Sequence, residues 1–141
     1  MKPLIATAVF VMALTAVPAM AQTKGSDIGK LEYTENCAVC HGTTGEGNGP
    51  ISGLMTSPPV ADLTTISQRN NGVFPFARIY GTIDGTEEFK WHGTREMPIW
   101  GTQYTAKGFN TIVEVTPKDV ESYVQGRIVA LVGYIYNLQK K

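Results

Sequence analysis

The chain has 141 residues, of which 43% are hydrophobic, and it carries 12 basic and 12 acidic side chains. This size and composition are typical of a globular protein with one core. The balanced charge argues against a nucleic-acid-binding protein, because the neutralisation of phosphates requires a basic face.

The N-terminus has the pattern of a secretory signal peptide. Lys2 precedes an apolar run over residues 4–17, and the small-residue site Ala19-Met20-Ala21 follows. The run is shorter than the roughly 20 apolar residues of a membrane span, although an uncleaved anchor is the alternative. We therefore predict a signal peptide over residues 1–21, one domain over residues 22–141, and export to the periplasm.

A first helix is expected from a cap at Ser26 or Asp27 to about Cys37. The segment Cys37-Ala38-Val39-Cys40-His41 then has the spacing of a covalent haem attachment site. Two thiols so placed reach adjacent vinyl groups of one porphyrin, and the imidazole that follows can bind the iron from the same side. The alternative is a redox disulfide with an incidental histidine, but that reading expects a βαβ pattern around the cysteines, which is not found.

The residues on either side of this motif resemble the class I, mitochondrial-type cytochromes c in their bacterial form. The similarity lies in Gly29-Lys30-Leu31-Glu32-Tyr33 before the cysteines and in the glycine-rich residues 41–50 after them. The resemblance implies an all-α class I cytochrome c fold, with N- and C-terminal helices crossing over one covalently bound haem c and with long connecting loops. It also implies that Pro50 lies near the proximal histidine, where a backbone carbonyl accepts a hydrogen bond from the imidazole.

Two further helices are expected before the distal part of the chain. Asp62 can cap a short helix through Arg69. Pro75 suits a first helical position, and the apolar residues after it follow helical spacing until Gly85: Phe76, Ile79, Tyr80 and Ile83.

Met97 is the predicted sixth ligand of the iron. It precedes Pro98, as in the distal loop of the resembling family, and proline restrains it to extended backbone. Met55 follows His41 too closely to reach the opposite face of a haem. A core methionine is the alternative role for Met97, and the rival ligands are His92 and, more weakly, Lys90.

Haem propionates require cationic or hydrogen-bonding partners. Arg95 and Trp100, which flank Met97, are the predicted donors. The alternatives are that Arg95 is solvated and that Trp100 only covers the ring. Weaker candidates are Arg69, Trp91 and Tyr104.

The segment over residues 104–115 is longer than a minimal distal connection, and residues 111–115 alternate like a short strand. We expect a small hairpin or an interaction loop there. A long last helix begins with Thr116 as cap and Pro117 inside it, and Gly126 could kink it. Its predicted buried stripe is Val120, Val124, Ile128, Leu131, Ile135 and Leu138. From the resemblance, Gly29 is expected to admit Tyr134 where the first and last helices cross.

These features predict a periplasmic carrier of single electrons and not an enzyme, because no catalytic constellation is found. The expected partners are a redox donor and acceptor, such as a periplasmic dehydrogenase, a terminal oxidase or another cytochrome. No nucleic acid and no membrane span after signal cleavage are expected, and the state is a monomer or weak dimer. The alternatives are the cytochrome subunit of a periplasmic dehydrogenase, for example a sulfite-oxidising one, and an open-site haem sensor or enzyme.

Overall fold

The computed structural model describes residues 23–55, 59–86, 97–111 and 116–141, and every regular element in these ranges is a helix. The predicted signal peptide lies outside these residues. The α-helices are α1 (Thr23–Asn36), α2 (Ala38–His41), α3 (Phe76–Asp84), α4 (Trp100–Thr111) and α5 (Pro117–Asn137). Short 3₁₀ turns occupy Ser52–Leu54, Leu63–Thr65 and Gln68–Asn70. The predicted all-α class of a cytochrome c fold is therefore confirmed.

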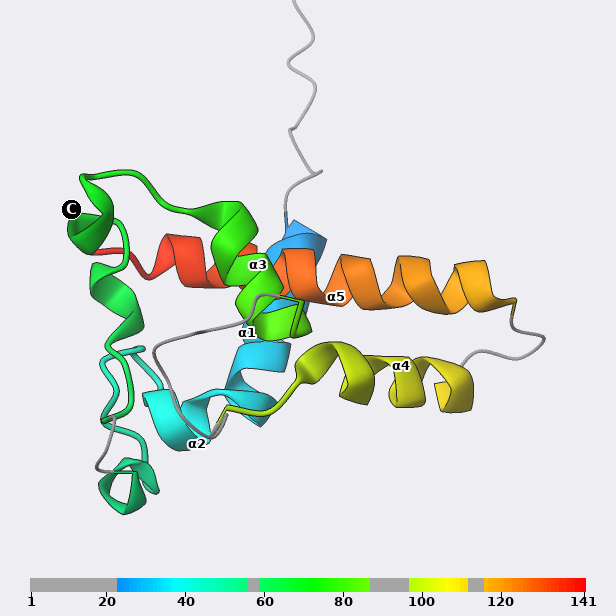
Figure 1. Ribbon diagram of the computed structural model, residues 1–141, viewed down its shortest axis with the longest axis horizontal. Coiled ribbons are helices and arrows are strands. Elements are labelled where there is room, and N and C mark those ends of the chain that lie inside the picture. The colour runs from blue at the N-terminus through cyan, green and yellow to red at the C-terminus, as the bar shows by residue number, and fades with distance from the viewer. Residues whose placement is uncertain (1–22, 56–58, 87–96, 112–115) are drawn as a thin grey trace, which may run out of the picture.

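The long helix α5 is the element around which the others are arranged. It packs against α1, α3 and α4, and in Figure 1 it runs across the molecule with α4 alongside it and α1 crossing it. Five of the six predicted stripe residues of α5 are buried, and Leu138, just beyond the helix, is partly buried against the same core. The helix is continuous through Gly126, so the break considered there does not occur.

The start of α5 is a capping box, which includes the predicted cap, Thr116. The hydroxyl of Thr116 accepts a hydrogen bond from the amide of Asp119, and the Asp119 carboxylate accepts one from the amide of Thr116 at 3.0 Å. Hydrogen bonds from Thr116 hold the pKa of Asp119 below its usual range. A group with a depressed folded-state pKa stabilises above its unfolded-state pKa, so this contribution is lost as the pH falls through the folded-state value.

We predict that Thr116→Ala lowers the free energy of unfolding by about 1 kcal/mol, because one amide of the first turn loses its partner. Denaturant unfolding of the holoprotein measures the change. Thr116→Ser should restore most of the loss, and Ser122→Ala, at an exposed position on the same helix, is the control. Equal midpoints for Thr116→Ala and Ser122→Ala would contradict the capping role.

The crossing of α1 and α5 is close because position 29 has no side chain. A Cβ built on Gly29 would lie 2.7 Å from the carbonyl carbon of Ala130 and 3.0 Å from the Cβ of Tyr134. The ring of Tyr134 packs on that of Tyr33 with the centroids 5.1 Å apart. The predicted contact between Gly29 and Tyr134 is therefore confirmed, although the tightest approach is to the backbone of Ala130.

A buried carboxylate joins the same helices. Glu32 on α1 is fully buried and pairs with the guanidinium of Arg127 on α5. The amide of Asn36 donates to it at 2.9 Å, and the ammonium group of Lys107 on α4 lies 3.9 Å away. A buried charge is tolerated when it is paired and hydrogen-bonded, so this cluster fixes which faces of the three helices meet.

The helices between residues 62 and 85 differ in detail from those predicted. Asp62 does cap, accepting from the amide of Thr64 at 2.8 Å, but two separate 3₁₀ turns follow in place of one helix. Pro75 is the N-cap of α3 and not its first helical residue. Gly85 ends α3 as predicted, with a φ of 95° that favours glycine.

The hairpin expected after Met97 is wrong for the residues that the structure describes. Residues 100–111 form α4, and residues 112–115 lie outside the described ranges. The buried face of α4 consists of Gly101, Tyr104 and Gly108. Two of its three positions are glycines, so this face lacks the large apolar residues by which a helix is normally predicted.

Among the described residues, no helix is both long and apolar enough to cross a membrane.

Candidate functional site

The short helix α2 carries the cysteines and the histidine. Cys37 is its N-cap, and Cys40 and His41 are its last two residues, so all three belong to one turn that follows α1 directly. The amide of His41 donates to the carbonyl of Cys37 at 2.9 Å, which closes the turn. Both thiols are free, with Cys37 buried and Cys40 partly buried. The structure thus holds the two sulfur atoms and the imidazole close together without a disulfide.

The glycine-rich loop after His41 folds back onto α2. The amide of Gly49 donates to the carbonyl of Cys40 at 3.0 Å, and that of Gly47 donates to the carbonyl of His41 at 2.8 Å. A Cβ on Gly49 would lie 2.6 Å from the Cys40 carbonyl, so no larger residue fits without a shift. These bonds satisfy carbonyl groups at the C-terminal end of α2 and fix the loop against it.

The imidazole of His41 is oriented by a carbonyl different from the one predicted. Its Nδ1 lies 3.0 Å from the backbone oxygen of Ala61. The sequence placed this acceptor in the loop around Pro50. In the structure the residues flanking Pro50 instead contact the backbone of α2: the amides of Gly49 and Ile51 donate to the carbonyls of Cys40 and Val39. Pro50 itself is exposed.

The segment that carries Ala61 is held from both sides. The amide of Leu63 donates to the carbonyl of Gly45 at 2.7 Å. Gln139, near the end of the chain, donates to the carbonyl of Leu63 and accepts from the amide of Ser67. The residues just after α5 therefore fix the segment that orients the histidine.

Cys37 and His41 open onto an apolar cleft. Met97 lines the same cleft, as do residues from α3 and from the end of α5. The other lining residues are Leu63, Ile66, Ile79, Thr82, Ile83 and Ile135. A flat, largely apolar cofactor would be shielded from water by such walls.

The other predicted site residues either do not line the cleft or lie outside the described residues. Trp100 is the first residue of α4, partly buried, with its ring centroid 6.2 Å from that of Tyr104. Four other candidates lie outside the described residues: Arg95, Trp91 and the rival ligands His92 and Lys90. Met55 is partly buried at the end of a 3₁₀ turn and does not line the cleft. Arg69 is exposed and donates to Thr65 and to the carbonyl of Asp62.

Burial shifts the pKa values of Cys37 and His41. It raises the pKa of the Cys37 thiol to about 12, helped by the nearby charges of Glu32 and Cys40. A thiol so protonated is a poor nucleophile for disulfide exchange. Burial also lowers the pKa of His41, against the effect of the Ala61 carbonyl. The neutral imidazole can donate through Nδ1 to Ala61 and keep the Nε2 lone pair for a metal.

A comparison of the sequence with models of protein families assigns the chain to a family. The family model described as cytochrome c matches residues 26–124, from α1 into α5. The chain belongs to the cytochrome c family. Neither the comparison with curated proteins nor that with solved structures gave a match. Cytochromes c transfer electrons through haem c, and this chain has two cysteines with which to hold it.

The residues of this cytochrome fit that cofactor. Two free thiols lie one helical turn apart beside a neutral imidazole whose orientation is fixed, and the cleft they face is apolar. The sequence identified the chemical groups, and its helical periodicity also marked Ile79, Ile83 and Ile135 as buried. It missed Ala61, Leu63 and Ile66, because these residues lie in or beside a three-residue 3₁₀ turn, which is too short to give a periodic signal.

Proposed function

We propose that the protein is a periplasmic carrier of single electrons that uses one haem c, bound covalently through Cys37 and Cys40 and ligated by His41 and Met97. The observation that supports this proposal most is that Met97 lines the same apolar cleft as Cys37 and His41. It comes from a part of the chain far from the attachment motif, so the fold brings a thioether to the cleft of the imidazole. When bound, the haem supplies a metal that gains and loses one electron.

The protein's own residues have separate roles in this proposal. Cys37 and Cys40 prevent loss of the cofactor, and His41 offers Nε2 because Ala61 occupies its Nδ1. The thioether of Met97 favours the reduced metal and so raises the reduction potential. The isoleucines of α3 and α5 exclude water from the cleft. Because His41 and Met97 would hold the metal in both oxidation states, no ligand exchange would accompany electron transfer, and no substrate turnover would be involved.

Replacement of Met97 tests the proposed ligation. Met97→Ala should abolish the weak far-red sulfur-to-iron absorption band of the oxidised holoprotein and lower its reduction potential, while the haem stays attached. Absorption spectroscopy with redox titration measures both. Met55→Ala is the matched control, because Met55 lies outside the cleft. Retention of the band in Met97→Ala would exclude this residue as the ligand.

Carbon monoxide binding to the ferrous wild-type protein separates the carrier from an open-site sensor or enzyme. A carrier whose metal would be held by both His41 and Met97 should bind the gas poorly, and Met97→Ala should bind it readily. Mass spectrometry of the exported protein tests the remaining points: a mass lacking residues 1–21 and including one haem supports periplasmic maturation. We propose a redox donor and acceptor as partners, and co-purification with a larger enzyme would identify a dehydrogenase subunit.

A further inference from the structure

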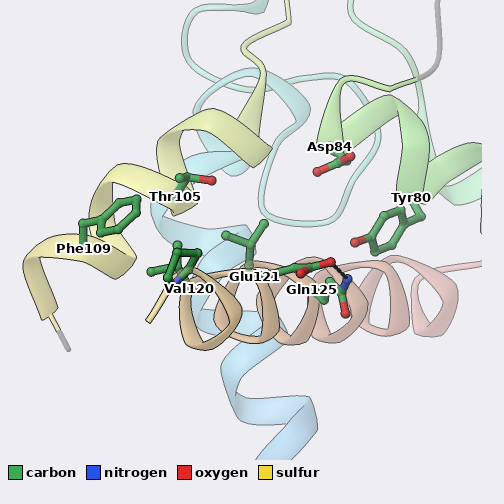
Figure 2. A pocket seen from close by; sticks show the side chains of 9 residues that line it. Tyr80, Asp84, Thr105, Phe109, Val120, Glu121 and Gln125 are labelled. Atoms are coloured by element: carbon green, nitrogen blue, oxygen red, sulfur yellow. Dashed lines mark hydrogen bonds between the residues drawn. The ribbon is translucent and has the colours of Figure 1, made fainter. Parts of the chain in front are cut away.

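A groove separate from the haem cleft lies between α3, α4 and α5, with a volume of about 420 Å³ (Figure 2). Val120 and Val124 of α5 give it an apolar lining, and Phe109 of α4 stands at its side. Phe109 is 56% exposed, so its side chain is accessible to a molecule in the groove. We refer to this feature as the α3–α4–α5 groove.

The described charged residues that line the groove are of one sign. Asp84 of α3 and Glu121 of α5 both line it, and none of the described lining residues is a cation. The ion pairs found in the described parts of the chain involve only Glu32 and Glu46, so neither groove carboxylate is neutralised by a cation there. Glu121 accepts one hydrogen bond, from Gln125 at 3.1 Å, as Figure 2 shows. Tyr80 adds a hydroxyl group between the two carboxylates, and burial followed by their charges raises its pKa.

The groove shares a wall with the haem cleft. Ile79 and Ile83 of α3 line the cleft, while Tyr80 and Asp84 of the same helix line the groove. Helical spacing puts these pairs on different faces of α3. A molecule in the groove would therefore be separated from the contents of the cleft by α3.

We propose that the α3–α4–α5 groove docks an electron-transfer partner through a segment that presents a lysine or arginine beside an apolar side chain. The cation would lie between Asp84 and Glu121, and the apolar side chain would cover Val120, Val124 and Phe109. Charge complementarity selects this occupant, because an anionic segment would face two carboxylates without a compensating cation. The partner's redox role rests on the proposed function, whereas the binding preference of the groove does not.

Peptide titration of the ferrous holoprotein, followed by amide nitrogen–proton NMR spectra, tests the docking site. The probe is the blocked tetrapeptide acetyl-Lys-Phe-Lys-Leu-amide, and the control replaces both lysines by glutamates. The cationic peptide should shift signals of α3, α4 and the first half of α5, and the anionic peptide should not. Glu121→Gln combined with Asp84→Asn should weaken binding about fivefold, the effect of two partly exposed charge pairs.

Two controls make the result decisive. Glu35→Gln, at an exposed position on α1, should leave the affinity unchanged, and Glu121→Gln alone covers the case in which Asp84→Asn disturbs folding. Three outcomes would each overturn the proposal. They are equal shifts with both peptides, shifts confined to other surfaces, and a dimer in sedimentation in which a second copy closes the groove. If the haem spectrum is normal but the cationic peptide does not bind, only the proposed docking site is wrong. Peptide binding without Met97 ligation would overturn only the proposed ligation.

Discussion

Replacement of Gly29 by valine should destabilise the holoprotein by about 3 kcal/mol or more, at the upper end of the effects of overpacking. A side chain at this position meets the carbonyl group of Ala130 and the Cβ of Tyr134. Backbone atoms cannot rotate away as a flexible side chain does, so α1 and α5 must separate. Their separation would also strain the pairing of Glu32 with Arg127, which bridges the same two helices.

Denaturant unfolding monitored by helical circular dichroism measures this effect. Gly29→Ala is the milder variant, to be used if Gly29→Val does not accumulate, and it should be destabilised in the same direction. Gly126→Ala is the matched control, because a Cβ on Gly126 meets nothing within 4 Å. That change should be neutral or stabilising by up to ~1 kcal/mol, the difference in helix propensity. If Gly29→Ala is as stable as Gly126→Ala, the close crossing is wrong.

Replacement of both Cys37 and Cys40 by alanine should abolish covalent attachment of the haem completely. The chain has two cysteines, so no other thiol can replace them. His41 and Met97 remain, but coordination alone is reversible, and acidified organic solvent should extract all of the cofactor. Mass spectrometry of the denatured polypeptide measures the result.

The single variants provide the controls for this experiment. Cys37→Ala and Cys40→Ala each keep one thiol and should retain a fraction of haem that resists extraction. If the double variant still carries the mass of a haem after denaturation, the attachment site is not this motif. If wild-type protein matured in the periplasm carries no haem, the proposed function itself is wrong.

Local sequence signals predicted the parts of the molecule that depend on neighbouring residues. The spacing of Cys37, Cys40 and His41 predicted that the three residues share one helical turn, as they do in the structure, and their role in haem attachment stays a prediction. Thr116 and Pro117 identified the start of α5 in a similar way, since a cap and the first helical residue are neighbours in the sequence. The contact of Gly29 with Tyr134 is not local, and it was predicted only through the resemblance to cytochromes c.

The features that the sequence did not reveal depend on close packing between distant segments. In α4, Gly101 approaches the end of α3, and Gly108 approaches Val120 and Tyr123 of α5. Glycine in such contacts gives no hydrophobic periodicity, so the part of α4 from Tyr104 onward was expected to be a hairpin or an interaction loop. The partner of His41 was also assigned to the wrong loop, because the position of Ala61 depends on Gln139 at the other end of the chain.

The order of the elements along the chain has a consequence for maturation. The attachment turn ends at His41, whereas α5, whose Ile135 lines the same cleft as Cys37, begins only at Pro117. A polypeptide that emerges from its N-terminus exposes both sulfur atoms well before the helix that covers them has appeared. Once α5 has docked, Cys37 is only 6% exposed. Under the proposed function, the two thiols would therefore be most accessible for attachment of the haem before α5 has docked.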